Sequence, residues 1–391
     1  WALVRNKGYW ESNDTVNTVT VIDGLKRVIQ VKKTAEVMKD GEKQSGMIIS
    51  GKEVYDALGR VERQGQPVFR PGSENGYTPV SAEKPTVNTY DVMGRKTRIA
   101  FPDGTSIANL YGFEDGMFLT RTTDQEGKIK KVLKDVQGQI VTVKEGPGED
   151  ETNYEYNPMN EIERVIDADL NVTEIDYDNL GRRISINNPD AGLVEYNYDQ
   201  AGNLIRKITP NLRRDGKYIR YIYYFNHLER IDYPGMANTY YTYGSPGADG
   251  NGAGRIVAVD NGVLREKRAY GRLGELVRTD RTIAGTTYTT KYEFDSMGRM
   301  RRMVFPDSET LVYAYDRGGL LRHAATHENG IINTYLKDIG YDEFGQRVQV
   351  KYGNDAVSTY EYDDTTRRLM HLKTVNKDGT VFQNIEYAYD R

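Results

Sequence analysis

Short stretches in which apolar and polar residues alternate run along nearly the whole chain. Residues 194–198 read Val-Glu-Tyr-Asn-Tyr and residues 311–315 read Leu-Val-Tyr-Ala-Tyr, so the tyrosines of each stretch share one parity. Residues 16–22, Val-Asn-Thr-Val-Thr-Val-Ile, show a similar alternation near the start. A period of two is typical of β-strands that cover one face and expose the other. The pattern therefore predicts a chain made of many short strands.

Each alternating stretch ends in a recurrent motif, Tyr-Asp-x-x-Gly-Arg followed by an aliphatic residue, and residues 177–184 are its best copy. Other clear copies begin at Tyr55, Tyr90, Tyr198, Phe294, Tyr315 and Tyr341, and weaker ones at Tyr156, Phe225, Tyr270, Tyr362 and Tyr389. Successive starts at 156, 177 and 198 are 21 residues apart. A fixed period of about 20–50 residues predicts a repeat architecture. The residues assigned to the motif are Tyr55, Asp56, Gly59, Arg60, Tyr90, Asp91, Gly94, Arg95, Tyr177, Asp178, Gly181, Arg182, Tyr198, Asp199, Gly202, Asp295, Gly298, Arg299, Tyr315, Asp316, Gly319, Tyr341, Asp342 and Gly345.

The chemistry of the motif predicts a tight turn between two antiparallel strands. An Asp at the first position and a Gly at the fourth suit a type I turn followed by a residue at positive φ, which is a hairpin connection with a Gly bulge. A second turn, containing Pro-Asp, follows Gly94, Gly181 and Gly298 after seven intervening residues. One repeat is therefore predicted to be two strands and two turns.

Repeats of this kind predict an all-β fold in which each strand pairs with its neighbour in the chain. About a dozen repeats give roughly two dozen strands, whereas twisted open sheets rarely exceed about ten without curling. We therefore expect a long antiparallel meander of hairpins that curls into a spiral, hollow shell. Residues 1–85 are predicted to be an opening region with irregular strands and a Pro/Gly-rich loop, and residues 86–391 a continuous repeat shell.

The opening region and two loops depart from the repeat. Strands are expected around residues 28–33 and 47–50, with a short helix considered over 34–39 and a polar loop over 39–46. Residues 64–85 hold four prolines and are expected to form a long irregular loop, either functional or packed across another element. The Gly/Ala-rich residues 244–254 are expected to be a flexible insertion. Asn160 stands at a glycine position, which Asn tolerates, whereas Glu229 and Thr366 at that position predict turns of another geometry.

The recurrence of Asp and Arg favours a structural role for both. Catalytic groups are placed once, in one pocket, whereas these residues return in repeat after repeat. The Asp side chain is expected to cap its own turn by accepting hydrogen bonds from backbone N–H groups. For the Arg, two interpretations stay open: an ion pair with an acid, or a cation–π contact with a Tyr of an adjacent strand.

Composition excludes several classes of function. The net charge is −4, so the basic footprint of a nucleic-acid-binding protein is absent. No apolar run approaches the length of a membrane span. The lack of Cys rules out disulfides and a thiol nucleophile. Tyr is over-represented, at 30 residues against nine Phe, which suits a wall between two solvated spaces, although β-propensity accounts for any single Tyr.

Two short patterns have some of the features of metal sites, but neither predicts one. His323 and His327 are four residues apart and precede Glu328, but they stand in a strand and loop context rather than on a helix. The stretch 249–252, Asp-Gly-Asn-Gly, is similar to the start of a calcium loop but lacks the acid that closes one. We therefore expect no catalytic residue, no cofactor and no metal, and an enzyme only if an irregular loop hides a pocket.

The Tyr-Asp-x-x-Gly-Arg repeat resembles the signature of the Rhs/YD-repeat family. Residues 90–391 carry it clearly and residues 23–60 weakly. Residues 18–30 also resemble the start of the repeats in large bacterial Rhs proteins that are related to insecticidal toxin-complex shells. The resemblance implies a strip of sheet that spirals round a cavity. In polymorphic bacterial toxins such a shell holds a C-terminal toxic domain, often released by self-cleavage, and in teneurins a related barrel serves cell adhesion.

The family's Asp-Pro-containing cleavage motif and a toxin domain are both missing from the 391 residues, so no catalytic residue is carried over. The chain has no initial Met and stops within a repeat turn, and we expect it to be a fragment of a repeat region. The leading hypothesis is a non-catalytic shell segment of a secreted or surface-exposed bacterial protein. Its expected partners are an encapsulated toxin or effector beyond residue 391 and secretion or delivery proteins. The alternative is an adhesion scaffold that binds surface glycans.

Overall fold

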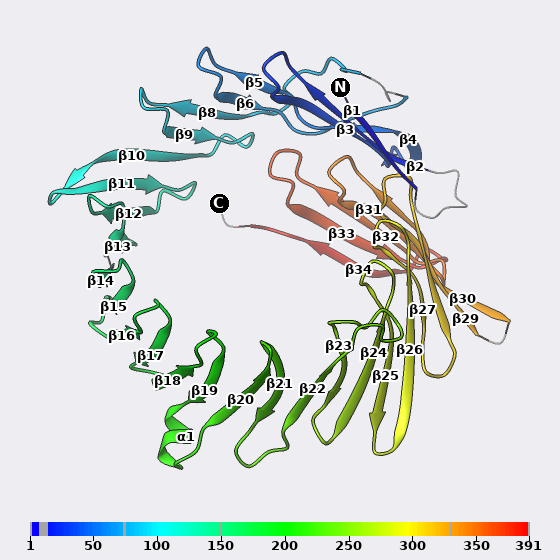
Figure 1. The fold of residues 1–391 in the computed structure, drawn as a ribbon. Helices are drawn as coiled ribbons and strands as arrows, with labels where there is room; N and C mark the ends of the chain where they lie inside the picture. The colour runs from blue at the N-terminus through cyan, green and yellow to red at the C-terminus, as the bar shows by residue number, and fades with distance from the viewer. Residues whose placement is uncertain (1, 8–14, 73–75, 149, 329, 390–391) are drawn as a thin grey trace. The chain divides into compact units, whose positions relative to one another are not determined.

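A computed structural model describes residues 2–7, 15–72, 76–148, 150–328 and 330–389 (Figure 1). These residues form 34 strands and one short helix, so the predicted all-β class is confirmed. The chain divides into two compact units, one of residues 1–107 and 290–391 and one of residues 108–289. The predicted boundary after residue 85 lies inside the first unit and stays a prediction.

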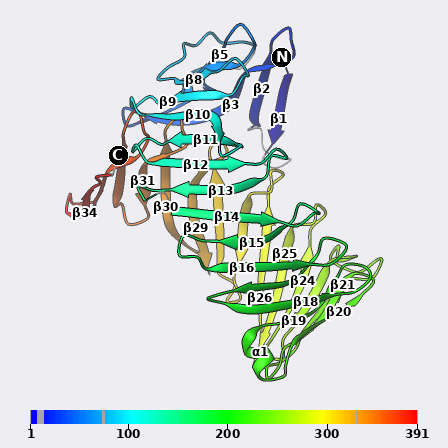
Figure 2. The same ribbon diagram turned by 90° about the vertical axis from the view of Figure 1, so that its left-hand side faces the viewer.

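The second unit is one antiparallel meander in which strands pair in chain order. Figure 2 shows β11 to β16 lying one beside the next. Helix α1 (Pro210–Arg214) follows β19. The strands are β10 (Ser106–Glu114), β11 (Met117–Thr123), β12 (Ile129–Lys134), β13 (Ile140–Glu145), β14 (Asp150–Tyr156), β15 (Ile162–Ile166), β16 (Val172–Tyr177), β17 (Arg183–Asn188), β18 (Gly192–Tyr198), β19 (Leu204–Ile208), β20 (Ile219–Tyr224), β21 (His227–Asp232), β22 (Thr239–Tyr243), β23 (Ile256–Asp260), β24 (Leu264–Tyr270) and β25 (Leu276–Ile283).

The first unit contains an N-terminal sheet of five strands in the order β1-β2-β3-β4-β7. Its strands are β1 (Ala2–Lys7), β2 (Thr15–Ile22), β3 (Val28–Lys39), β4 (Glu42–Ile49) and β7 (Val68–Arg70). Val19, Val21 and Met47 form its buried core. Four further strands of this unit pair in chain order: β5 (Glu53–Tyr55), β6 (Val61–Gln64), β8 (Thr86–Tyr90) and β9 (Lys96–Ala100).

The last strands of the chain complete the first unit as a second stretch of meander. They are β26 (Thr286–Phe294), β27 (Met300–Val304), β28 (Thr310–Tyr315), β29 (Leu321–Glu328), β30 (Ile331–Tyr341), β31 (Arg347–Tyr352), β32 (Val357–Tyr362), β33 (Leu369–Val375) and β34 (Val381–Glu386). Their buried core is formed by Ile339, Tyr341 and Val350. We refer to β28–β31 as the docking wall, because β3 packs against it. A Cβ placed on Gly340 would lie 2.9 Å from the Cβ of Met38 in β3.

Three expectations for the opening region are wrong. Residues 34–39 are not a helix but the second half of β3, and residues 42–46 of the expected polar loop belong to strand β4, which also contains the strand expected around 47–50. The two strands meet at Asp40-Gly41, with φ of 52° and 79°. A two-residue hairpin turn of type I′ requires positive φ at both of its central residues, and Asp-Gly is a sequence signal for such a turn. Residues 68–70, within the expected irregular loop 64–85, form β7 and pair with β4.

Candidate functional site: the repeat ladder

The motif turn has the predicted geometry, and the copy that begins at Tyr177 shows it. The Asp178 N–H donates to the Arg182 carbonyl over 2.9 Å, and the Gly181 N–H donates to the Asp178 carbonyl over 3.0 Å. Gly181 has φ of +76°. The register shifts between Asp176 and Tyr177, which is the expected bulge. Sequence reasoning therefore located both the turn and its unusual backbone position.

The Asp side chain caps its own turn, as expected. Its Oδ1 atom accepts hydrogen bonds from the N–H groups of Leu180 at 2.9 Å and Arg182 at 3.0 Å. The hydrogen bond from the Arg182 side chain is the main cause that holds the pKa of Asp178 below its usual value, against an opposing effect of burial. Asn157 accepts the equivalent bonds in the preceding repeat, with Asn160 at φ 67° in place of Gly.

The motif Arg makes both of the contacts that the sequence left open, and a third. The guanidinium of Arg182 pairs with Asp178, with 2.6 Å between Nε and Oδ2. Its Cζ atom lies 4.9 Å from the ring centroid of Tyr198, the Tyr of the next repeat. Its Nη1 atom donates to the carbonyl of Asp199 over 2.9 Å. Arg60 repeats this set with Asp56, Tyr90 and Asp91, so each of these two arginines joins its repeat to the one after it.

The motif Tyr joins its repeat to the one before. The hydroxyl of Tyr198 donates to the carbonyl of Arg183 over 2.9 Å, and the hydroxyl of Tyr177 donates to the carbonyl of Ile162 over 3.0 Å. In both cases the acceptor follows directly after the last residue of the preceding turn. One such hydrogen bond contributes about 0.5–1.5 kcal/mol, and a surface cation–π contact about 0.5–1 kcal/mol. The Tyr–Asp–Arg contacts thus form a ladder that stabilises neighbouring hairpins against sliding apart.

Two turns have another geometry, as Glu229 and Thr366 predicted. The copy at Phe225 is a two-residue turn, with Phe225 and Asn226 at φ of 44° and 63°, and Glu229 lies in β21. In the copy at Tyr362, the residue at positive φ is Arg367, one position after Thr366.

Two motif aspartates differ from the others in their surroundings. Asp316 and Asp342 are 8% and 7% exposed, about as buried as Asp295 at 9%, but unlike Asp295 they have Leu320 and Gln346 where their own Arg would be. Asp342 instead pairs with Arg367 of the next repeat. Burial is the main cause that raises the pKa of both carboxyls above the usual value, the reverse of the shift at Asp178. The sequence marked these positions as motif residues but did not show their burial.

The two faces of the β10–β25 sheet differ in chemistry. Residues directly opposite each other in an antiparallel pair share a face. The set that includes Ile175, Ile186 and Val194 therefore lies on one face, and Asp176, Ser185 and Glu195 lie on the other. We call the first the tyrosine face, because the same pairing places on it Tyr154, Tyr177, Tyr196, Tyr221 and Tyr241. Burial is the main cause that raises the pKa of the Tyr221 and Tyr241 hydroxyls.

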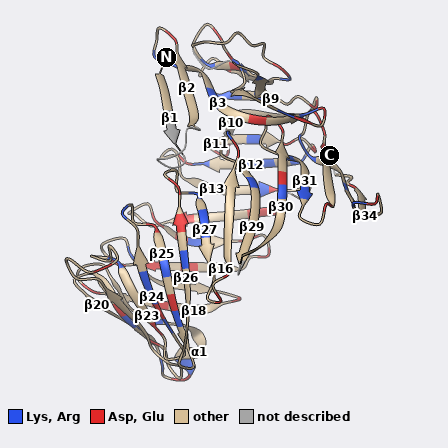
Figure 3. Ribbon diagram, turned by 90° about the vertical axis from the view of Figure 1, so that its right-hand side faces the viewer, with Lys and Arg blue, Asp and Glu red and all other residues tan. Residues whose placement is uncertain are grey.

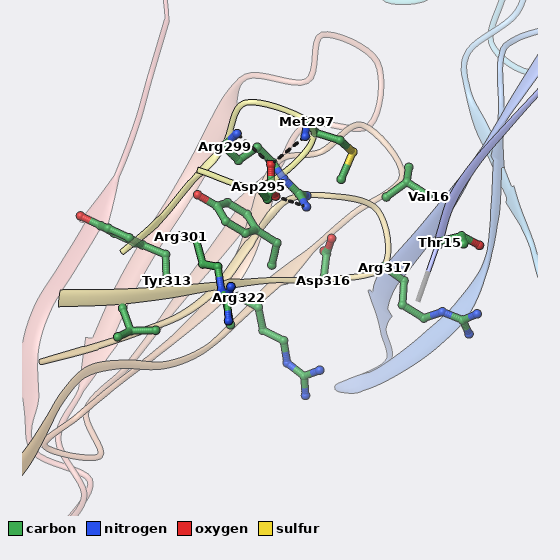
Figure 4. Close-up of a pocket in the computed structure, with 13 residues that line it drawn as sticks. Thr15, Val16, Asp295, Met297, Arg299, Arg301, Tyr313, Asp316, Arg317 and Arg322 are labelled. Carbon is green, nitrogen blue, oxygen red and sulfur yellow. Dashed lines mark hydrogen bonds and ion pairs between the residues drawn. The ribbon is translucent and has the colours of Figure 1, made fainter. Parts of the chain in front are cut away.

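A cavity of about 380 Å³ lies in the first unit, between the start of β2 and the strands β27–β29 (Figure 4). Thr15 and Val16 line it from the N-terminal sheet, and Asp295, Met297, Arg299, Arg301, Val312, Tyr313, Ala314, Tyr315, Asp316, Arg317 and Arg322 line it from the meander. Asp295 is paired with Arg299 over 2.7 Å, and Arg322 with Asp338 over 3.2 Å. One of these two pairs, Asp295 with Arg299, belongs to the ladder.

The two patterns weighed as metal sites serve the fold where the structure describes them. His323 and His327 both lie in β29, which removes the helical spacing that a two-ligand face needs. The Asn251 side chain donates to the Tyr270 carbonyl over 2.9 Å, and the Gly250 carbonyl accepts from the Tyr270 N–H over 2.8 Å. Acidic and basic residues are spread along the strands (Figure 3). No helix in the described ranges is long and apolar enough to cross a membrane.

Comparison with known proteins confirms the resemblance to toxin-complex proteins with Rhs/YD repeats. No protein-family model matches the chain. The toxin subunit YenC1 of Yersinia entomophaga is 30% identical over 107 residues, which are 26% of this chain and 10% of that protein. The double-stranded DNA deaminase toxin A of Burkholderia cenocepacia (strain H111) is 24% identical over 330 residues, 76% of this chain and 19% of that protein.

The fold is shared with solved toxin-complex shells. A crystal structure of TcdB2-TccC3 without its hypervariable C-terminal region matches 99% of this chain and 22% of its own, with a TM-score of 0.84 and 18% identity. The long antiparallel meander is thus that of a known shell fold. The chain spans between a tenth and about a fifth of the lengths of these three proteins.

Proposed function

We propose that this chain, which has the fold of the Rhs/YD-repeat shells of bacterial toxin complexes, is a non-catalytic wall segment that encloses a toxic cargo. The cargo belongs to the same, longer polypeptide, and the protein is secreted from a bacterium or displayed on its surface, with delivery proteins as partners. The relatives support a longer polypeptide, because the region that matches this chain is a small part of each of them.

The observation that carries the proposal is the tyrosine face of the second unit. All strands of that unit belong to one sheet, so its described residues include no strand of a second sheet that could cover the face. Aliphatic and Tyr side chains alternate along it, as in Ile219, Tyr221, Ile231 and Tyr241. Tyr gives a large apolar contact area with a polar tip. Such a face can hold an extended polypeptide by many weak contacts without selecting one sequence.

Protection of the cargo tests the proposal in the full-length protein. Limited proteolysis of the natural polypeptide is compared with that of a double variant, Tyr221→Ser and Tyr241→Ser. The control is Tyr240→Ser, because Tyr240 neighbours Tyr241 but lies on the opposite face. We expect the double variant to release cargo peptides faster while the control does not. A cargo cleaved equally fast in all three proteins would contradict the proposal.

A second candidate function, glycan binding at a cell surface, is favoured by one exposed aromatic pair. Tyr224 and Phe225, 62% and 82% exposed, form an edge-to-face pair with 4.6 Å between ring centroids at the β20–β21 turn. Aromatic rings at such a tip can stack on sugar rings. Binding to a panel of glycans that is lost in Tyr224→Ala, with the cargo still protected, would favour this function.

A further inference from the structure

The contact between the N-terminal sheet and the docking wall replaces the usual ladder at one turn. In the β28–β29 turn, Gly318 takes the position that Leu180 holds in the standard repeat, and Leu320 takes the position of the motif Arg. A Cβ at Gly318 would lie 3.3 Å from the Cα of Ala35 and 3.4 Å from the carbonyl oxygen of Thr34, both in β3. Leu320 packs against the Ile339–Tyr341–Val350 core. Gly318 and Leu320, the two residues that depart from the motif, therefore allow this turn to fit beneath β3.

These changes leave the Asp316 carboxylate buried with no ion-pair partner among the described residues. Its Oδ1 atom accepts a hydrogen bond from the Leu320 N–H over 2.8 Å. Arg317 follows it in the chain, but its side chain points away from the carboxylate (Figure 4). The next Arg, Arg299, is already bound to Asp295 over 2.7 Å. Asp316 thus lacks the cation that the ladder supplies to Asp178 or Asp295.

The groups that face Asp316 from the N-terminal sheet are Glu36 in β3 and Lys43 in β4. Lys43 is shared, since its Nζ atom lies 3.3 Å from Glu36 Oε1 and 2.5 Å from Asp338 Oδ1 in β30. Arg322 also pairs with Asp338. Tyr341 is the titratable group on the side of the docking wall. In this seam between the N-terminal sheet and the docking wall, Asp316 also lines a cavity with Arg301 and Arg317, whereas Arg299 and Arg322 are bound to Asp295 and Asp338.

We propose that Asp316 is an acid-dependent latch, which tightens the docking of the N-terminal sheet on β28–β31 when it takes up a proton and loosens it when it loses one. Protonation removes the charge of a carboxylate that is only 8% exposed, has no ion-pair partner among the described residues and lies near the carboxylate of Glu36. When the sheet undocks, the carboxyl returns to water, where it ionises readily. Docking is therefore strongest in acid and weakens as the pH rises through the raised pKa of Asp316. The device is independent of what the wall encloses.

The test is amide hydrogen exchange in the 391-residue chain at about pH 5 and about pH 7.5, corrected for the intrinsic effect of pH. Peptides from β3 and β4 are expected to exchange more slowly at the lower pH, because part of the Asp316 population is protonated there and almost none at the higher pH. Peptides from β16–β17 are the internal reference. In Asp316→Asn, which cannot ionise, the β3 and β4 peptides are expected to be protected at both pH values.

Two matched variants separate the seam from general effects of charge. Asp342→Asn removes a carboxyl that is equally buried but is paired with Arg367, and Asp178→Asn removes a standard motif carboxyl. Both are expected to keep the pH step in β3 and β4, and Glu36→Gln to shrink it. A wild-type chain without the pH step, or an Asp316→Asn chain that keeps it, would overturn the proposal. If Asp316→Asn does not fold, a full pH step in Glu36→Gln overturns it instead.

Discussion

The Arg182 guanidinium lies over the ring of Tyr198 at 4.9 Å while it holds Asp178, so one side chain joins the end of one hairpin to the start of the next. Arg60 and Tyr90 stand in the same relationship at 4.5 Å, and Arg299 and Tyr315 at 4.3 Å. Because each contact spans a single hairpin boundary, the meander is stabilised locally, boundary by boundary.

Removal of one motif Arg or Tyr should weaken the contact between two neighbouring hairpins. Arg182→Ala is expected to lower the free energy of local unfolding by about 1–2 kcal/mol, because it removes an ion pair and a cation–π contact together. Tyr198→Phe, which loses only the hydroxyl bond to Arg183, is expected to cost about 1 kcal/mol. Hydrogen exchange of residues 183–208 measures both. In a double-mutant cycle of Arg182→Ala and Tyr198→Ala, a coupling free energy of zero would show that the contact between the guanidinium and the ring contributes nothing.

The motif glycine should resist substitution because of its backbone. Gly181→Ala is expected to cost about 1 kcal/mol or more, since φ is +76° and a Cβ would approach the Glu161 carboxylate at 2.6 Å. Gly112→Ala in β10 is the control, with nothing within 4 Å of its Cβ. Asn160→Gly is expected to be neutral or stabilising at the equivalent position. Thermal unfolding measures all three, and equal costs for Gly181→Ala and Gly112→Ala would contradict the account.

Acid should act in opposite directions on two groups of motif aspartates. Hydrogen bonds hold the pKa of Asp56, Asp91 and Asp178 below the usual 3.8, so their contribution to stability is complete above that value. It is lost as the pH falls through the lowered pKa. We expect repeat turns to loosen below about pH 4, whereas the Asp316 seam is already tightened by then. NMR titration of the carboxyl groups measures both shifts, and a pKa of Asp178 above 3.8 would contradict the first.

The Pro/Gly-rich loop should detach when one buried side chain is removed. Gln30, 2% exposed, donates to the Thr78 carbonyl over 2.7 Å and accepts from the Thr78 N–H over 2.9 Å. Gln30→Ala leaves both Thr78 groups without these bonds, at a cost of about 1–3 kcal/mol. We expect faster proteolysis within residues 76–85, and no change in Gln44→Ala, because Gln44 is exposed in β4. Unchanged cleavage in Gln30→Ala would show that other contacts hold the loop.

Much of the described fold follows from the sequence, because the interactions that form it are local. Asp178 reaches N–H groups two and four residues ahead, and Tyr177 and Arg182 reach only the neighbouring hairpins. A motif that repeats every 21 residues therefore specifies turn, bulge and strand pairing at once. The alternation of apolar and polar residues did not predict strands over residues 34–46. The turn dipeptide Asp40-Gly41 was the stronger sequence signal there, because it connects β3 to β4 as a hairpin.

Only the tertiary structure decided which copies of the motif lie under another layer. Asp178 and Asp316 have the same place in the motif, yet one is only partly buried beside its Arg and the other is buried beneath β3. Residues about 280 positions apart, such as Ala35 and Gly318, meet there. The sequence determined the repeating unit because its energy lies in contacts between chain neighbours. The docking of the N-terminal sheet depends on burial between distant segments, which no periodic pattern records.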